Sequence, residues 1–399
     1  MHAPQHPEVR SARSAGAAGA RRPTLLVVAG EASGDLHAGH LVRALRERRP
    51  TVRVLAAGGP SLAAAGAEMV ADLVSHSVVG IAEVAGKLGT FSRLFRALVS
   101  LLRRERPDAV VLVDFPDFNM RLGRQAKEEG IPVVYYVSPQ VWGWRPGRIK
   151  DLARMVRKML VIFEFEEALY RKHGVDVEFV GHPLLDAMSE TIDAEGLRRR
   201  LRIGREETLI GLLPGSRSSV VRRHIPILRG VVGVVRAKVP EARFVVAGVA
   251  GLPAGTYDAF EGVCPVVTGH TREVLKAADL AIAASGTVTV EAAVIGTPLV
   301  VFYRVNPVTY AIVIPLVKVR NFAMVNLLAG REIAPEFLQY KATPERIGGK
   351  AVEILQGGRL PAMRAELAEV RTKLGGAGAS GRAADAILRV IDERPGRSS

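Results

Sequence analysis

Cysteine is nearly absent from this chain of 399 residues, because Cys264 is the only one. A single cysteine excludes an internal disulfide framework and a zinc site built from cysteines. Long apolar runs are missing too: the most apolar stretch, 305–319, is interrupted by two prolines, an asparagine and a lysine. A membrane-spanning helix needs about 20 apolar residues, so none is expected. The nine histidines are scattered and form no H-E-x-x-H motif, and we expect neither a metal ion nor another cofactor.

Positive charge is in excess, with 55 Lys and Arg against 40 Asp and Glu and a formal net charge of +15. The excess predicts anionic partners, among them phosphorylated substrates, acidic lipid surfaces and nucleic acid. Residues 1–22 are rich in Arg, Ala, Ser and Gly and lack the apolar segment of a secretory signal. We expect a disordered basic tail there, with an amphipathic transit peptide as the alternative.

Short, wholly apolar runs alternate with helical patterns, which predicts an α/β fold with parallel strands buried on both faces. Strands are expected in two series, the first at 24–29, 52–57, 109–113, 133–137, 158–162 and 178–180, the second at 209–213, 243–248, 280–284 and 298–302. We therefore predict two doubly wound, Rossmann-like domains. Their expected limits are 23–181 and 207–360, with a charge-rich connector at 182–206 and two C-terminal helices in 361–399 that pack back toward the first domain.

Ligands of open parallel sheets bind beyond the carboxyl ends of the strands, where five loops of this chain carry distinctive residues. The first loop, Gly30-Glu-Ala-Ser-Gly-Asp35, follows a strand and opens a helix, so its backbone amides can receive an anion or a polar ligand. A tight turn with Asp35 as a helix cap explains the same residues. The loop has neither G-x-G-x-x-G spacing nor a P-loop lysine, which disfavours a dinucleotide or nucleoside triphosphate site.

The second loop begins at Asp114, directly after an apolar run. A partly desolvated carboxylate there can act as general base toward a substrate hydroxyl. Asp117 follows a proline, and capping of the helix that begins near Asn119 is the alternative to a chemical role. The third loop, 138–145, holds both tryptophans of the chain, Trp142 among them, which favours contact with an apolar or sugar face over core packing alone.

The fourth and fifth loops suit an anion. Pro214-Gly-Ser-Arg217 follows an apolar run and opens a helix, so that Arg217 can grip a phosphate; a solvated arginine is the plain alternative. In Ser285-Gly-Thr287 the small residues let a pyrophosphate approach the backbone. Glu291, one turn into the next helix, can hold two ribose hydroxyls, unless it is an ordinary acid of a first helical turn.

Together these motifs resemble those of the lipid-A-disaccharide synthases, a family of inverting glycosyltransferases of the two-domain GT-B type. The shared runs occur in the family's order and are Gly30–Asp35, Pro116–Asn119, Tyr136–Pro139 leading to Trp142, Leu213–Arg217, Ala284–Thr287 and Asn326–Arg331. The resemblance implies that two Rossmann-like domains face a central cleft, with the acceptor on the first and the UDP-sugar on the second. It also implies transfer of 2,3-diacylglucosamine from UDP to the 6-hydroxyl of 2,3-diacylglucosamine 1-phosphate, which gives a β(1→6) disaccharide.

The resemblance also implies residue roles, position by position. Asp114 resembles the general base, and Arg217 the essential cation at the UDP phosphates. Substrate contacts are implied for Glu31, Ser33, Asp117, Asn119, Trp142, Gly215, Ser216, Ser285, Gly286, Thr287, Glu291 and Asn326. Val220 stands where the family often has an acid, so a local ion pair with Arg217 is in doubt.

Because both implied substrates carry acyl chains, the acceptor side requires apolar surface rimmed by cations. The segment 91–104 has both on an amphipathic pattern that suits a membrane interface, although a core helix with a solvated arginine face explains it equally well. We expect a cytoplasmic enzyme held peripherally on the anionic inner membrane, with a homodimer as an open alternative.

Three other functions stand as alternatives. A UDP-N-acetylglucosamine 2-epimerase on the same scaffold would share the donor site but need no acyl pocket. A basic nucleic-acid-binding protein would use the +15 charge directly, but no RNP, KH or helix-turn-helix signal supports it, and we expect no nucleic-acid partner. A lipid carrier without catalysis would not depend on Asp114.

Overall fold

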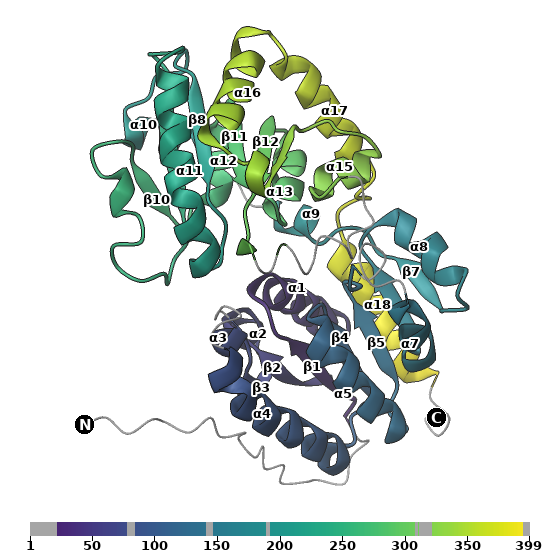
Figure 1. Cartoon of the computed structure of the whole chain (residues 1–399). Coiled ribbons are helices and arrows are strands. Elements are labelled where there is room, and N and C mark those ends of the chain that lie inside the picture. Colours follow the sequence, from purple (N-terminus) through teal and green to yellow (C-terminus); the bar gives the residue numbers. More distant parts are fainter. Residues whose placement is uncertain are drawn as a thin grey trace, which may run out of the picture. The chain divides into compact units, whose positions relative to one another are not determined.

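The computed structural model describes residues 22–77, 84–140, 147–188, 192–307, 310 and 321–393 (Figure 1). The chain forms two compact units, which we call unit 1 (residues up to Asp186 and from Leu374 onward) and unit 2 (Ala187–Lys373). Each unit is built on one wholly parallel sheet. The prediction of an α/β fold with two doubly wound domains is confirmed. Among the described residues, no helix has both the length and the apolar character needed to cross a membrane.

Unit 1 has the strand order β3-β2-β1-β4-β5-β6-β7. Its strands are β1 (Thr24–Ala29), β2 (Arg53–Gly58), β3 (Glu68–Asp72), β4 (Ala109–Val113), β5 (Val133–Tyr136), β6 (Lys158–Val161) and β7 (Val177–Phe179). Its helices are α1 (Ala32–Arg48), α2 (Pro60–Ala64), α3 (Val74–Ser77), α4 (Val84–Glu105), α5 (Pro116–Glu128), α7 (Arg148–Met155), α8 (Glu164–Arg171) and α18 (Ala379–Asp392). Helix α9 (Leu184–Ala187) spans the boundary between the units.

Unit 2 has the strand order β10-β9-β8-β11-β12-β13, the same winding as unit 1. Its strands are β8 (Leu209–Leu213), β9 (Arg243–Gly248), β10 (Val266–Thr268), β11 (Leu280–Ala284), β12 (Leu299–Tyr303) and β13 (Glu336–Leu338). Its helices are α10 (Ala194–Leu201), α11 (Ser218–Arg236), α12 (Thr271–Ala277), α13 (Val288–Ile295), α15 (Met324–Ala329), α16 (Pro344–Gln356) and α17 (Leu360–Thr372).

The central strands match the apolar runs of the sequence, because a strand covered on both faces must be apolar at every position. Strands β1, β4, β8 and β11 are buried along their whole length. Strands β3, β10 and β13 were not predicted, and all three lie at sheet edges. These strands are short and partly exposed, so they tolerate polar residues and show no continuous apolar run.

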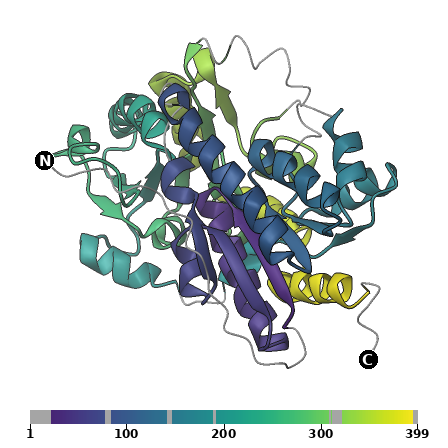
Figure 2. The same cartoon turned by 90° about the horizontal axis from the view of Figure 1, so that it is seen from below.

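The unit boundaries differ from the predicted domain limits. Residues 194–206, placed in a connector, belong to unit 2, where α10 packs on α12 and the buried Arg198 donates to the carbonyl of Ala277 at 3.0 Å. Helix α17 also stays in unit 2, against α13 and α15. Of the two C-terminal helices, only α18 belongs to unit 1. It packs beside α1, and Figure 2 shows its yellow ribbon next to the purple elements. The Asp186 carboxylate caps its start by accepting from the amides of residues 378–380.

Candidate active site

Both sheets have a topological switch point, where consecutive connections leave in opposite directions. It lies between β1 and β4 in unit 1 and between β8 and β11 in unit 2. Open α/β sheets bind ligands outside the carboxyl ends of the strands at such points. The loops that follow these four strands are four of the five predicted from the sequence, at 30–35, 114–119, 214–217 and 285–287. The remaining predicted loop, at 138–145, includes Trp142, which lies outside the described residues.

The two loops of unit 1 meet at Gly30. A Cβ atom added there would lie 2.2 Å from the ring of Phe115, so only glycine leaves room for that ring. A Cβ added at Gly34 would lie 3.8 Å from the Cβ of Asp114. The loop that carries the partly buried Glu31 and Ser33 therefore lies against the loop that begins at Asp114.

Asp114 sits in a strained turn. It has a φ of 48° and Phe115 a φ of 50°, so two consecutive non-glycine residues are in the left-handed region. Each such residue costs roughly 1–3 kcal/mol and persists only when its surroundings hold it, which is common at active sites. The carbonyl of Asp114 accepts from the Tyr135 hydroxyl at 2.7 Å and from the Asn119 side-chain amide at 2.8 Å. These two bonds hold the turn, and the Asp114 side chain remains half-buried.

Three other polar residues of unit 1 have structural partners. Asn119 is fully buried, and its amide also donates to the carbonyl of Val113, so it supports the turn. Asp117 is exposed on the first turn of α5 and forms a 2.8 Å ion pair with Arg148. The buried Asp35 caps a neighbouring helix, α2, through the backbone amides of residues 59 and 61.

The loop after β8 is open to solvent. Gly215 has a φ of +113°, which favours glycine, and both Ser216 and Arg217 are exposed. Arg217 is the N-cap residue of α11, a helix of 19 residues with no acid in its first turn. A helix N-terminus and an arginine at the carboxyl end of a strand are together suited to bind a phosphate.

The loop after β11 is equally accessible. Gly286 and Thr287 are exposed, and a Cβ added at Gly286 would meet nothing within 4 Å, so a ligand can approach this backbone. The hydroxyl of Ser285 already has a partner within unit 2, since it donates to the carbonyl of Phe322 at 3.3 Å. Glu291 follows in the first turn of α13, where burial raises the pKa of its carboxyl and the charge of Arg272 opposes the rise.

Asn326 is the predicted site residue whose placement is most clearly structural. It is fully buried, and its side-chain oxygen accepts from the amides of Ile333 and Ala334, both at 2.9 Å. Its side-chain nitrogen donates to the Ala334 carbonyl and to the Glu336 carboxylate. This network holds the chain around α15 in place, and no sequence motif had pointed to Glu336.

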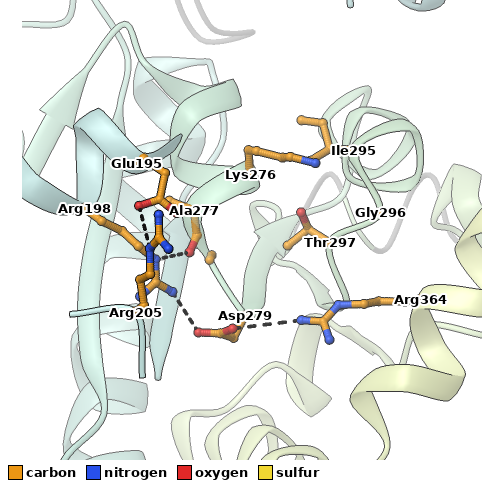
Figure 3. A pocket seen from close by; sticks show the side chains of 11 residues that line it. Glu195, Arg198, Arg205, Lys276, Ala277, Asp279, Ile295, Gly296, Thr297 and Arg364 are labelled. Atoms are coloured by element: carbon orange, nitrogen blue, oxygen red, sulfur yellow. Dashed lines mark hydrogen bonds and ion pairs between the residues drawn. The ribbon is translucent and has the colours of Figure 1, made fainter. Parts of the chain in front are cut away.

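A separate pocket of about 550 Å³ lies at the opposite, amino end of the second sheet (Figure 3). Its charged side chains pair mainly with each other: Arg198 with Asp279 at 3.0 Å, and Arg205 with Glu195 at 3.3 Å. None of the site residues predicted above is among the described residues that line it. We therefore place the candidate active site at the switch points and not in this pocket. The described residues also contain no group of three acidic, histidine or cysteine side chains placed to hold a metal ion.

Comparison with known proteins gives one consistent family. Residues 25–388 match the family model described as lipid-A-disaccharide synthetase. The chain is 41% identical to the lipid-A-disaccharide synthase of Syntrophus aciditrophicus, over 92% of this chain and 97% of that protein. It is 40% identical to the enzyme of the same name from Myxococcus xanthus, over 94% of this chain and 99% of that protein.

The solved structures that it resembles have low sequence identity and show the fold alone. One is a UDP-GlcNAc 2-epimerase from Neisseria meningitidis bound to UDP-GlcNAc, with a TM-score of 0.63, 12% identity and coverage of 92% of this chain and all of that one. Another is a putative UDP-N-acetylglucosamine 2-epimerase from Listeria monocytogenes, with a TM-score of 0.61, 15% identity and coverage of 94% and 98%.

Proposed function

Since the chain belongs to the lipid-A-disaccharide synthetase family, we propose that it transfers 2,3-diacylglucosamine from UDP to the 6-hydroxyl of 2,3-diacylglucosamine 1-phosphate. The observation that carries this proposal is the length of the family match, which covers the switch-point loops of both units. The epimerases share the fold at 12–15% identity, which supports no transfer of their activity.

We assign the UDP-sugar to unit 2. Arg217 and the N-terminus of α11 lie where a diphosphate can bind, and the exposed loop 286–287 leaves its backbone accessible. When the bond between the sugar and the diphosphate breaks, its electron pair stays on the phosphate oxygen. A guanidinium placed there stabilises this growing negative charge. Glu291 is assigned to the ribose hydroxyls.

We assign the acceptor to unit 1, with Asp114 as general base. Its carboxylate takes the proton of the 6-hydroxyl while that oxygen attacks the anomeric carbon from the face opposite UDP. The attack inverts the configuration at the anomeric carbon while UDP leaves. The product is therefore the β(1→6) disaccharide. The strained turn at Asp114 supports this role, because such strain is retained where a side chain must be aimed.

An aromatic group beside Asp114 is suited to acyl chains. The ring centroids of its neighbouring members lie between 5.6 and 6.4 Å apart, and the members are Phe91, Phe95, Phe115 and Phe118. Phe91, Phe95 and Phe115 are only partly buried, and Arg93 and Arg96 are exposed on the same helix, α4. Apolar rings flanked by cations match a substrate with both acyl chains and phosphate.

Peripheral binding to an anionic membrane is proposed on the same surface. Much of the apolar face of α4 packs in the core of unit 1, since Leu94, Leu98 and Leu101 are buried, so membrane contact falls to the partly exposed rings and arginines. Co-sedimentation with vesicles that contain anionic lipid, but not with neutral vesicles, is the expected result. Unchanged co-sedimentation of the Arg93→Glu, Arg96→Glu double variant would contradict this surface.

The reaction is tested by incubating the purified protein with both lipid substrates and following the disaccharide by mass spectrometry. A product that requires both substrates establishes the transfer. Conversion of the UDP-sugar alone would favour the epimerase. If neither substrate changes while the protein is folded, the assigned chemistry is wrong.

A further inference from the structure

His224 links two loops at the carboxyl edge of the second sheet. It lies in the second turn of α11 and is fully buried, against the rings of Phe302 at 4.7 Å and Tyr303 at 5.4 Å between centroids. Its Nδ1 lies 2.8 Å from the carbonyl oxygen of Pro214. Its Nε2 lies 3.0 Å from the amide nitrogen of Arg304 and 3.2 Å from the carbonyl oxygen of the same residue. Pro214 directly follows β8, and Arg304 directly follows β12.

One neutral tautomer of His224 satisfies the closest partner of each ring nitrogen. A carbonyl oxygen only accepts, so Nδ1 carries the proton and donates it to Pro214. In the neutral ring Nε2 is then unprotonated and accepts from the amide of Arg304 at 3.0 Å, a shorter contact than the 3.2 Å to the Arg304 carbonyl. Burial lowers the pKa of His224, which favours this neutral form. Both nitrogens are thus occupied by backbone partners, and neither faces a substrate.

The two linked loops belong to strands that are not neighbours. β11 lies between β8 and β12 in the sheet, and its own loop starts at Ser285. The amide of Ser285 donates to the carbonyl of Phe302 at 2.9 Å, which ties the end of β11 to β12. Three loops at one edge are therefore connected through His224 and the end of β12.

The chain beyond β12 is held at a second point. The side chain of Gln339 accepts from the amide of Val305 at 3.0 Å and donates to its carbonyl at 3.2 Å. Arg304 is thus held at its own amide by His224 and at the next residue by Gln339, and its side chain is exposed. Its backbone is fixed while its guanidinium is left available at the same sheet edge as Arg217.

We propose that His224 is a positioning residue of the donor site, which sets the spacing of the Arg217 loop and Arg304 so that both cations address the UDP diphosphate. This inference rests on the proposed binding of UDP by unit 2. A diphosphate has two charged groups, and one arginine neutralises only part of that charge. A second, fixed arginine adds charge-assisted bonds without the entropy cost of ordering its backbone.

The test compares variants that remove one or both hydrogen bonds of His224. His224→Leu removes both; His224→Asn keeps a donor near the Nδ1 position, and His224→Gln keeps an acceptor near the Nε2 position. The control is Thr297→Val, which loses a buried 2.8 Å hydrogen bond to the Leu275 carbonyl. Thr297 lies at the amino end of the strands, opposite to the loops that His224 links. UDP affinity is measured by calorimetry, and amide hydrogen exchange is followed at 215–221 and 304–305.

We expect His224→Leu and Arg304→Gln each to weaken UDP binding by about tenfold, the effect of one lost charge-assisted or positioning bond. The Asn and Gln variants should each recover part of the loss, and only the His224 variants should speed exchange in both loops. Thr297→Val should leave UDP affinity and this exchange unchanged.

Wild-type UDP affinity in a folded His224→Leu protein would overturn the proposal. If that variant does not fold, wild-type affinity and exchange in both His224→Asn and His224→Gln would overturn it instead. Absence of UDP binding by the wild-type protein is a different result, because it would remove the donor-site assignment itself.

Discussion

The hydroxyl of Tyr135 donates a 2.7 Å hydrogen bond to the carbonyl oxygen of Asp114. Tyr135 lies on β5, and Asp114 directly follows the adjacent strand β4, in a left-handed turn. Burial, followed by the charge of Asp114, raises the pKa of Tyr135 well above its usual value, so the hydroxyl remains a donor at any working pH. A buried side chain therefore helps to hold the residue that we assign as the base.

Tyr135→Phe should lower kcat by about tenfold and leave the KM for the UDP-sugar nearly unchanged, because one of the two bonds that aim Asp114 is lost. The free energy of unfolding should fall by about 1 kcal/mol. Steady-state kinetics and urea denaturation measure both. Asp186→Asn is the control within unit 1, since it weakens the cap of α18 and should reduce stability without lowering kcat.

Asp114→Asn should abolish most of the transfer, by roughly 10²–10⁴-fold, while UDP-sugar binding is retained, because the amide cannot accept the proton of the 6-hydroxyl. Asp117→Asn is the matched control in the same loop. It weakens the ion pair with Arg148, in which Asp117 is 70% exposed, and such surface pairs contribute at most about 1 kcal/mol. Equal activity of the two variants would argue against Asp114 as the base.

Arg217→Ala should weaken UDP binding and slow transfer by about 2 kcal/mol each, or roughly 30-fold, the effect of a lost charge-assisted contact. Calorimetry with UDP and steady-state rates measure these two effects. The control is Arg229→Ala, which removes an exposed arginine further along the same helix. The donor site is assigned wrongly if the two variants bind UDP alike.

Stability should decrease at acid pH because of His182. Burial, with a smaller contribution from nearby His37, lowers the pKa of His182 to about 3, and its Nδ1 accepts from the amide of Leu184 at 3.1 Å. The native state keeps the ring neutral, whereas the unfolded chain binds a proton below a pH of about 6.5. The contribution of neutral His182 to the free energy of unfolding is therefore complete above a pH of about 6.5. It is lost as the pH falls toward 3, by about 1.4 kcal/mol per pH unit.

Urea unfolding at pH 7.5, 6.5 and 5.5 measures this dependence. His182→Asn keeps an acceptor for the Leu184 amide but does not titrate, so its stability should vary less with pH. His173→Asn, at an exposed position in the same unit, should behave like the wild type. A wild-type pH slope in His182→Asn would contradict the assignment.

The sequence was most informative where one physical requirement determines the residue type. Strands β1, β4, β8, β9 and β11 have the limits that their apolar runs predict. The loops at 30–35, 114–119, 214–217 and 285–287 lie at strand ends as predicted, since parallel strands place all their carboxyl ends at one side of the sheet. Edge strands such as β13 escaped prediction because half-exposed positions accept polar residues.

The roles of the polar residues were harder to predict. Asn119 and Asn326 belong to motifs that resemble a family's active site, yet both are fully buried and bonded to backbone groups. A motif shows that a residue type is required at a position, but a requirement to hold a loop looks the same as a requirement to hold a substrate. No role was predicted for Tyr135 or His224, because each lies in an ordinary apolar strand or helix pattern.

By itself, the sequence determined the α/β class, the central strands, the loops that can carry chemistry and the family. Local periodicity and strand burial depend only on neighbouring residues, so they are visible in one dimension. The tertiary structure alone decided which side chains hold those loops. The strand order places β5 beside β4, so the Tyr135 hydroxyl can donate to the Asp114 carbonyl. The packing of α11 places His224 in contact with the amide of Arg304, which is 80 positions away in the sequence.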